Sequence, residues 1–130
     1  MNFKYLGKSN LKVSSYCLGT MTFGETTSES DAHDQINESI SSGINFIDTA
    51  EMYPTCPIRK ETSGETEKII GNWINNNKDK RKDIILATKV VGNGFKYIRN
   101  GGPITRETIK VAIHGSLKRL KTDYIDLYQL

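Results

Sequence analysis

The fold is decided by the stretch Gly43-Ile44-Asn45-Phe46-Ile47-Asp48-Thr49-Ala50-Glu51-Met52-Tyr53. Its glycine can close a preceding helix in a left-handed cap, because glycine adopts positive φ without steric cost. The apolar run from Ile44 to Asp48 then has the length and composition of a buried strand, and it ends in a charge. A helix followed directly by a buried strand is the repeating unit of α/β proteins.

Helices are predicted on both sides of this strand. Before it, Ser28-Glu29-Ser30-Asp31 resembles a helix start, and apolar residues recur every four positions at Ala32, Ile36 and Ile40. After it, Thr62-Ser63-Gly64-Glu65 opens a second helix. The buried face of the second helix is predicted to consist of Ile69, Ile70, Trp73 and Ile74.

The same cycle then returns along the chain. A strand is predicted from Ile84 to Lys89, followed by a Gly-rich loop from Gly92 to Pro103 and a helix after Thr105. Another strand begins between Tyr124 and Leu130. The apolar residues that the third helix carries are Ile109, Ile113, Leu117 and Leu120.

Four predicted strands thus alternate with three helices, starting from the compact strand Cys17-Leu18-Gly19. Each unit takes roughly 30 to 40 residues, which indicates βαβ crossovers and a parallel sheet. A doubly wound sheet and a (β/α)8 barrel both have this order. The stretch from Gly19 to Gly24 lacks the G-x-G-x-x-G pattern of dinucleotide-binding doubly wound folds, so the sequence favours the barrel.

The whole chain, residues 1–130, is predicted to form part of one barrel domain. Residues 1–16 are a short hairpin, because Phe3 to Leu6 and Lys12 to Tyr16 flank a turn sequence. The βα units occupy residues 17–130. We expect the N-terminal half of a (β/α)8 TIM barrel, truncated in strand 4, because a complete barrel typically needs about 250 residues.

Composition narrows the class of protein. The 130 residues are 36% hydrophobic, enough for one packed core, and 18 Lys and Arg against 15 Asp and Glu leave a net charge of +3. This charge is too small to argue for nucleic acid or an anionic membrane as a partner. No signal segment begins the chain and no run approaches the roughly 20 apolar residues of a membrane span, so we expect a cytoplasmic protein.

Two further expectations concern single features. Cys17 and Cys56 match no metal or redox spacing, so we expect no metal site and no disulfide, with Cys17 buried in its strand. The segment from Lys78 to Asp83 carries charges of both signs between a helix and a strand. This mixture favours a solvated turn over a phosphate or nucleic-acid site.

Charged and phenolic side chains stand where the predicted strands end. Asp48 closes one strand, Lys89 closes the next, and Tyr53 lies in the loop after the first. Parallel α/β folds place their chemistry at these carboxyl ends. If the three meet, the ammonium favours the phenolate, and the phenol can act as a general acid toward an oxygen whose neighbouring carbon receives hydride. A structural Asp–Lys ion pair with Tyr53 in an ordinary loop is the alternative.

Four stretches follow one another in an order that characterises one family. They are Leu18 to Gly24, Gly43 to Tyr53, Ala87-Thr88-Lys89, and Ser116 to Tyr128. In this order they resemble the aldo-keto reductase superfamily. The variant Ala50-Glu51-Met52-Tyr53-Pro54 looks most like the bacterial Tas-type reductases.

The resemblance implies an activity and roles for three residues. Aldo-keto reductases are NADPH-dependent (β/α)8 barrels that reduce aldehydes and ketones, small-molecule carbonyl substrates, through a tetrad of Asp, Tyr, Lys and His. On this match Tyr53 is the proton donor, Lys89 makes it a stronger acid, and Asp48 holds Lys89. The catalytic His of the family would directly follow Leu130.

The resemblance also implies a cofactor site. Gly19, Thr20 and Met21 match the turn beside the nicotinamide, together with Asp48. Most other cofactor contacts of the family lie in the second half of the barrel, so we expect the 130-residue chain alone to be inactive and to need that half as a partner. A non-catalytic regulatory protein, resembling the aldo-keto-like β subunits of potassium channels, is the alternative.

Overall fold

A computed structural model describes all of residues 1–130, and it begins with the predicted hairpin. Strands β1 (Phe3–Tyr5) and β2 (Lys12–Ser14) pair antiparallel, with Lys4 opposite Val13. The backbone N–H of Ser14 donates to the Asn45 side chain at 2.8 Å. Because Asn45 directly precedes a strand of the main sheet, the hairpin is fixed at the end where the parallel strands start.

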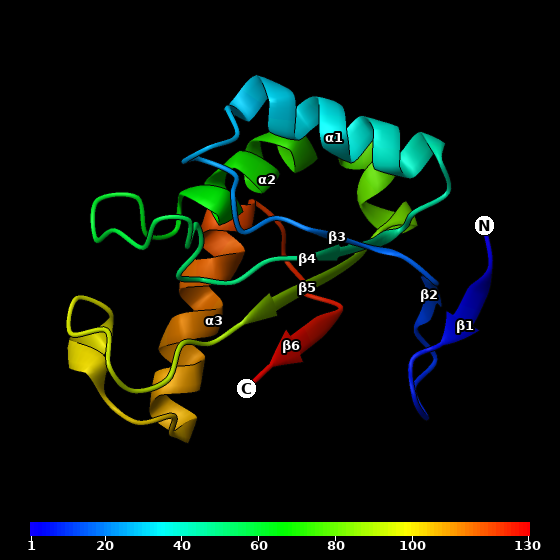
Figure 1. Cartoon of the computed structure of the whole chain (residues 1–130). Coiled ribbons are helices and arrows are strands. Elements are labelled where there is room, and N and C mark those ends of the chain that lie inside the picture. Colours follow the sequence, from blue (N-terminus) through cyan, green and yellow to red (C-terminus); the bar gives the residue numbers. More distant parts are fainter.

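The main sheet has four parallel strands in the order β3-β4-β5-β6 (Figure 1). This arrangement confirms the predicted α/β architecture, because each strand pairs with the next one along the chain. Asp48 lies beside Gly19 on one side and beside Ala87 on the other, while Lys89 lies beside Gln129. The strands are β3 (Cys17–Gly19), β4 (Phe46–Asp48), β5 (Ile85–Lys89) and β6 (Leu127–Gln129).

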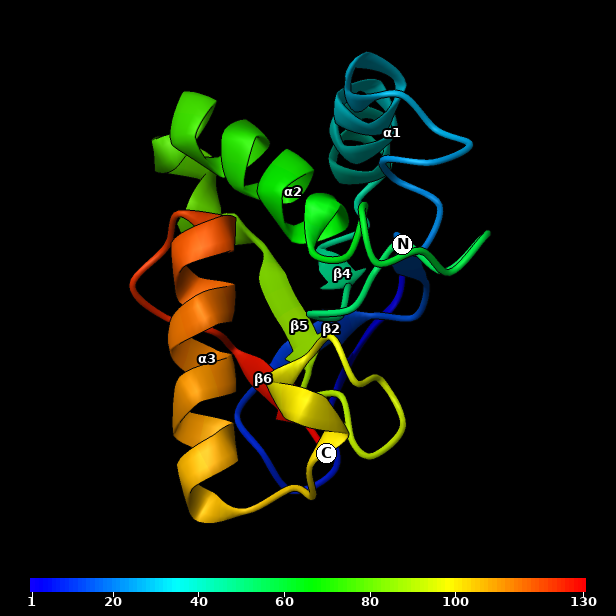
Figure 2. The same cartoon turned by 90° about the vertical axis from the view of Figure 1, so that its left-hand side faces the viewer.

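Three α-helices lie along one side of this sheet (Figures 1 and 2). The first begins with a Ser28 side chain that accepts the Asp31 N–H at 3.1 Å, and it is followed by Gly43 at φ +85°. Both ends thus follow the prediction, because a serine cap and a left-handed glycine satisfy backbone groups that the helix leaves free. The helices are α1 (Glu29–Ser41), α2 (Glu65–Asn76) and α3 (Arg106–Leu120), with short 3-10 helices at Lys78–Asp83 and Arg99–Gly101.

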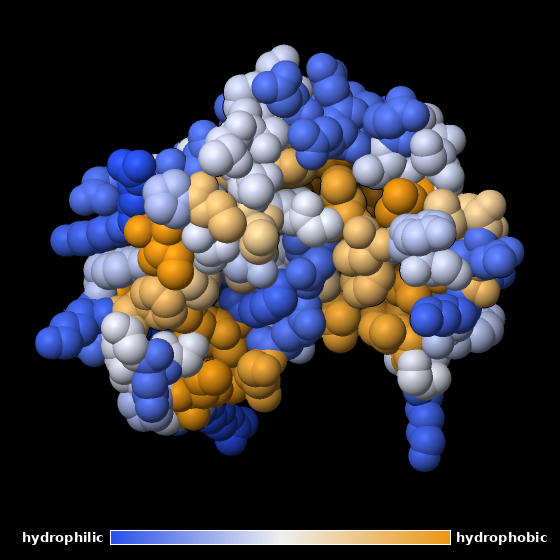
Figure 3. All heavy atoms as spheres, viewed as in Figure 1, coloured by the Kyte–Doolittle hydropathy of each residue, from blue (hydrophilic) through white to orange (hydrophobic).

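The core lies between the sheet and the helices. Ile47 of β4 and Leu86 of β5 are fully buried there, against Trp73 of α2, whose indole N–H donates to Asn37 at 3.0 Å. Side chains alternate between the two faces of a strand, so Asp48 and Lys89 face away from this core. In the view of Figure 1, hydrophobic residues lie at the surface on both sides of a hydrophilic band (Figure 3). None of the helices is both long and apolar enough to span a membrane.

Helix α3 packs differently from its sequence pattern. Of the four apolar residues predicted on it, only Leu120 is buried, while Ala112 and Ser116 are buried instead of the larger side chains. The reason is a close approach between helices: a Cβ at Gly71 of α2 would lie 2.1 Å from the backbone oxygen of Arg119. Ala112 and Ser116 lie on the same face of α3 as Leu120, which is at this contact, and the larger side chains Ile109, Ile113 and Leu117 are half-buried.

We expect Gly71→Ala to lower the free energy of unfolding by about 2 kcal/mol or more, because overpacking usually costs 1–3 kcal/mol. The obstacle is backbone of α3, which cannot turn aside as a flexible side chain can. Gly92→Ala is the control, since its Cβ would make only ordinary contact with the side chain of Ile104. Urea denaturation of both variants measures the difference, and equal stabilities would contradict this packing argument.

Candidate active site

Asp48 is the last residue of β4, and its position is fixed from the backbone. Its carbonyl oxygen accepts a hydrogen bond from the Thr20 hydroxyl at 2.8 Å. Thr20 itself is fully buried. The carboxylate is therefore carried by a rigid strand end, on the sheet face that the helices leave uncovered.

Lys89 ends the neighbouring strand β5 and reaches Asp48 across the sheet. Its Nζ donates to Asp48 Oδ2 at 2.6 Å and to the Thr49 carbonyl oxygen at 2.8 Å. The two side chains are 30% and 28% exposed, so the ion pair is partly shielded from water. Opposite charges at this distance attract each other more strongly where water is partly excluded.

Tyr53 brings a phenol to the same ammonium. Its hydroxyl lies 3.5 Å from Lys89 Nζ, and the ammonium stands 4.9 Å from the centre of its ring. The loop backbone holds this residue, because the Tyr53 carbonyl accepts the Gly64 N–H at 3.0 Å as α2 begins. The structure thus brings together the acid, the phenol and the amine that the sequence placed at three separate strand or loop positions.

The residues expected beside a cofactor divide into two kinds. Gly19 has open space where a Cβ would stand, and Met21 is 46% exposed in the next turn. Thr20 points inward, since its hydroxyl is used by Asp48. The open surface beside Gly19 can therefore accept a flat ligand against the backbone, whereas Thr20 contributes through its support of β4.

Two contacts of this rim were not predicted from the sequence. Gln129 of β6 donates to Asp48 Oδ1 at 2.8 Å. Glu51, only 5% exposed, accepts the Val91 N–H at 2.6 Å and an Arg99 N–H at 2.7 Å. The hydrogen bond from Arg99 to Glu51 raises the pKa of the arginine. A glutamate two residues before the tyrosine, followed later by an arginine in a Gly-rich loop, was the only signal for the second contact.

Cys17 is exposed, and the expectation that it is buried was wrong. It lies on the uncovered face of β3, where its strand partner is Phe46, while Leu18 packs against the core on the other face. Partial burial of the thiol raises its pKa to about 11; the Asp48 carboxylate raises it as well, and Lys89 opposes the shift.

Alkylation of Cys17 near pH 8 should therefore be slow. The thiolate is the reactive form, and a pKa of about 11 in place of 9.0 leaves about 100-fold less of it. Iodoacetamide labelling of a Cys56→Ser variant isolates this thiol, and the same variant in concentrated urea gives the unprotected rate. Equal rates in the folded and unfolded protein would contradict the shift.

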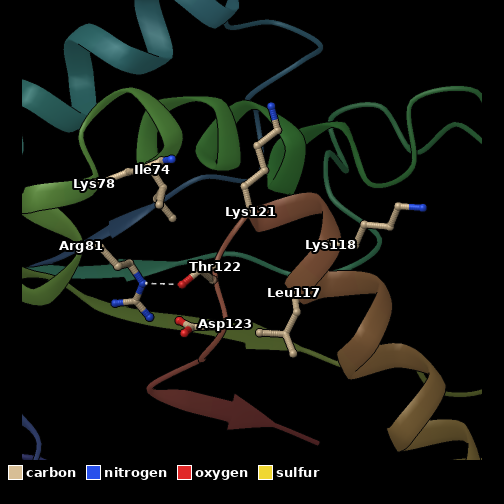
Figure 4. A pocket seen from close by; sticks show the side chains of 8 residues that line it. All are labelled: Ile74, Lys78, Arg81, Leu117, Lys118, Lys121, Thr122 and Asp123. Atoms are coloured by element: carbon tan, nitrogen blue, oxygen red, sulfur yellow. Dashed lines mark hydrogen bonds between the residues drawn. The ribbon is translucent and has the colours of Figure 1, made fainter.

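The segment Lys78–Asp83 also differs from its prediction as a solvated turn. It is a 3-10 helix, and Arg81 within it is only 6% exposed. The guanidinium donates to Thr122 at 3.1 Å (Figure 4). It also donates to Asp126 at 2.8 Å. These partners lie more than 40 positions away, so a run of charges gave no sign of them. Arg81 fixes the turn that leads from α3 into β6.

Arg81 also lines a surface hollow of about 450 Å³ between α2 and α3 (Figure 4). The side chains of Lys118 and Lys121 at its edge point away from Arg81 in that view. The N–H groups of this arginine already donate to protein oxygens. We therefore do not assign the hollow as a ligand site. Groups of three or more His, Cys, Asp or Glu side chains that could bind a metal ion are absent.

This parallel βα sheet, with Asp48, Tyr53 and Lys89 at one rim, is the arrangement expected in part of an α/β barrel. The profile of the Aldo/keto reductase family matches residues 16–130, and this chain belongs to that family. The predicted family and the predicted fold class, part of an α/β barrel, are both confirmed.

Individual relatives agree with this assignment. The chain is 49% identical over 133 residues to "Protein tas" of Escherichia coli (strain K12), covering 100% of this chain and 38% of that protein. It is 40% identical over 137 residues to "Uncharacterized oxidoreductase YrpG" of Bacillus subtilis (strain 168), covering 100% and 40%. Among solved structures, "aldo-keto reductase AKR11C1 from Bacillus halodurans (holo form)" matches with a TM-score of 0.77 and 38% identity, covering 100% and 40%. The chain spans about 40% of the length of these relatives.

Proposed function

We propose that these 130 residues supply the catalytic acid and part of the cofactor site of an NADPH-dependent reductase of aldehydes or ketones. One observation carries the proposal: Lys89 Nζ lies 2.6 Å from Asp48 Oδ2 and 3.5 Å from the Tyr53 hydroxyl. Family membership supports the reaction class. The 3.5 Å contact is at the limit of a hydrogen bond, and such contacts often tighten only when substrate is bound.

Each of the three residues has a separate task in this proposal. Tyr53 donates its phenolic proton to the carbonyl oxygen of the substrate. Lys89 stabilises the phenolate that this transfer leaves, because a cation beside a developing anion lowers its energy. Asp48 holds the ammonium beside the phenol. The nicotinamide cofactor, when bound, supplies the hydride that reduces the carbonyl carbon.

The surface beside the acid fits a nicotinamide. Gly19 leaves open space above the strand end, and the Asp48 carboxylate borders it on the neighbouring strand. We assign Gly19, Thr20, Met21 and Asp48 to the cofactor site, with Thr20 acting through its bond to Asp48. Further contacts are expected from the remaining strands of a barrel, so activity requires that part as a partner.

A fluorescence titration with NADPH tests the proposal. It compares the 130-residue chain with a complete barrel, defined here as residues 1–130 continued by the C-terminal part of the E. coli protein tas. We expect binding and turnover of an aldehyde by the complete barrel, and neither by the short chain. Tight binding without turnover by the complete barrel would contradict reduction and would favour a regulatory role.

Gly19→Ala in the complete barrel should raise the dissociation constant for NADPH by about tenfold, or about 1.4 kcal/mol. The added methyl group occupies the space where the ring would approach the backbone, and it meets no protein atom within 4 Å. The fold should therefore be unaffected. Gly92→Ala is the matched control, since its Cβ would make only ordinary contact with Ile104. Unchanged affinity in Gly19→Ala would remove this residue from the cofactor site.

A further inference from the structure

We propose that Gln129 is a positioning residue of this site. Its side-chain amide holds the Asp48 carboxylate in the orientation that binds Lys89, through a hydrogen bond of 2.8 Å from Nε2 to Oδ1. This inference rests on the proposed function, and it adds to the acid, phenol and amine a fourth group that touches none of the reacting atoms.

The strand order explains why a residue on β6 reaches Asp48 on β4. Lys89 and Gln129 are neighbours in the register of β5 and β6, and Asp48 lies beside Ala87 in that of β4 and β5. In a barrel the inward side chains of alternate strands share one layer. Asp48 and Gln129 belong to alternate strands and therefore meet across β5, beside Lys89.

Donors on both sides fix the carboxylate. Oδ1 accepts from Gln129 and Oδ2 accepts from Lys89 at 2.6 Å, while the backbone oxygen of Asp48 accepts from Thr20. The terminal torsion of an aspartate is soft, so an ion pair to one oxygen alone leaves the group free to turn. With a second donor on the other oxygen, any rotation breaks one of the two bonds.

A neutral donor suits this task. An amide binds the second oxygen without adding a charge, so Lys89 stays the only cation that contacts Asp48. The Lys89 ammonium can move little before it loses contact with the phenol, because its Nζ is already 3.5 Å from the Tyr53 hydroxyl. If the carboxylate turned away, the Thr49 carbonyl alone would be left to hold the ammonium beside the phenol.

Three variants of the complete barrel test this role. Gln129→Leu removes the donor, Gln129→Glu keeps the shape but replaces the donor with a charge, and Gln35→Leu makes the first change on the exposed surface of α1. We expect Gln129→Leu to lower kcat by about tenfold, as for a lost hydrogen bond to a charged group. Gln35→Leu should match the wild type.

The glutamate variant provides a pH signature. Near pH 8 it should be less active than Gln129→Leu, because a second carboxylate faces Asp48 and competes for Lys89. Toward pH 5 it should recover relative to the wild type, since a protonated glutamate can donate the missing hydrogen bond. A role in packing alone predicts no such recovery. An identical pH dependence of turnover in Gln129→Glu and in the wild type would contradict the positioning role.

A second readout needs no turnover. The ¹H–¹⁵N signal of the Lys89 ammonium is visible only while its exchange with water is slow, which the contacts to Asp48 and Thr49 favour. Gln129→Leu should lose this signal, and Gln35→Leu should keep it. A barrel that turns over no carbonyl but loses the signal in Gln129→Leu supports positioning while removing the proposed function. A Gln129→Leu variant with full turnover or an unchanged signal overturns the positioning role.

Discussion

In the complete barrel, Tyr53→Phe should lower carbonyl turnover by about 1,000-fold, within the range that general acids contribute. The substitution removes the hydroxyl that donates the proton and leaves the ring. The ring can still face Lys89, whose Nζ lies 4.9 Å from its centre, so the Asp48–Lys89 pair should stay in place. NADPH affinity is expected to change less than twofold, because the phenol is not part of the proposed cofactor surface.

Steady-state turnover of an aldehyde and a fluorescence titration with NADPH measure the two expectations separately. Tyr16→Phe provides the matched control, because Tyr16 is 69% exposed and its hydroxyl makes no hydrogen bond within the protein. Turnover by Tyr53→Phe within threefold of the wild type would assign the proton donor elsewhere. Loss of both turnover and cofactor binding would instead indicate that the substitution disturbed the rim as a whole.

The parts of the fold that the sequence predicted are those with local causes. The capping serine Ser28 and the terminal glycine Gly43 act within one turn of their own helix. The apolar run that ends at Asp48 had to be a strand with a polar end, and Lys89 repeated that pattern. Because parallel strands end at one rim, strand ends alone sufficed to place these two residues together.

Contacts between distant segments could not be predicted in this way. Gln129 meets Asp48 across 81 positions of sequence, and Arg81 meets Asp126 across 45. A charged residue within a polar run is predicted to be exposed to solvent unless its partner is known. Such partners become known only from the packing of the helices on the sheet. The exposure of Cys17 has the same origin, since it depends on which face of β3 the helices cover.

A buried ion pair behind the site shows how such a contact matters for stability. Glu67 of α2 is fully buried and accepts from Arg119 of α3 at 2.6 Å and from the Thr88 hydroxyl at 2.6 Å. Thr88 directly precedes Lys89 in β5. One carboxylate thus joins two helices to the strand that presents the ammonium, and no local pattern in the sequence marks it.

Arg119→Met should destabilise the protein by about 3–5 kcal/mol, the usual effect of removing one partner from a buried pair. Methionine retains much of the apolar length of arginine, so the loss is chiefly that of the charge. Glu67 would then be a fully buried carboxylate whose remaining side-chain donor is Thr88. Urea denaturation at pH 7 measures the change in the free energy of unfolding.

The double variant Glu67→Gln/Arg119→Met separates charge from packing. It lacks the same arginine but leaves a neutral amide that can still bond to Thr88, so we expect it to regain about 2 kcal/mol over Arg119→Met alone. Lys68→Met on the exposed side of α2 is the control for loss of a surface cation, with an expected effect below about 0.5 kcal/mol. If the double variant were no more stable than Arg119→Met, the stranded charge of Glu67 would not be the cause, and the contribution of Arg119 would lie in its contacts along α3.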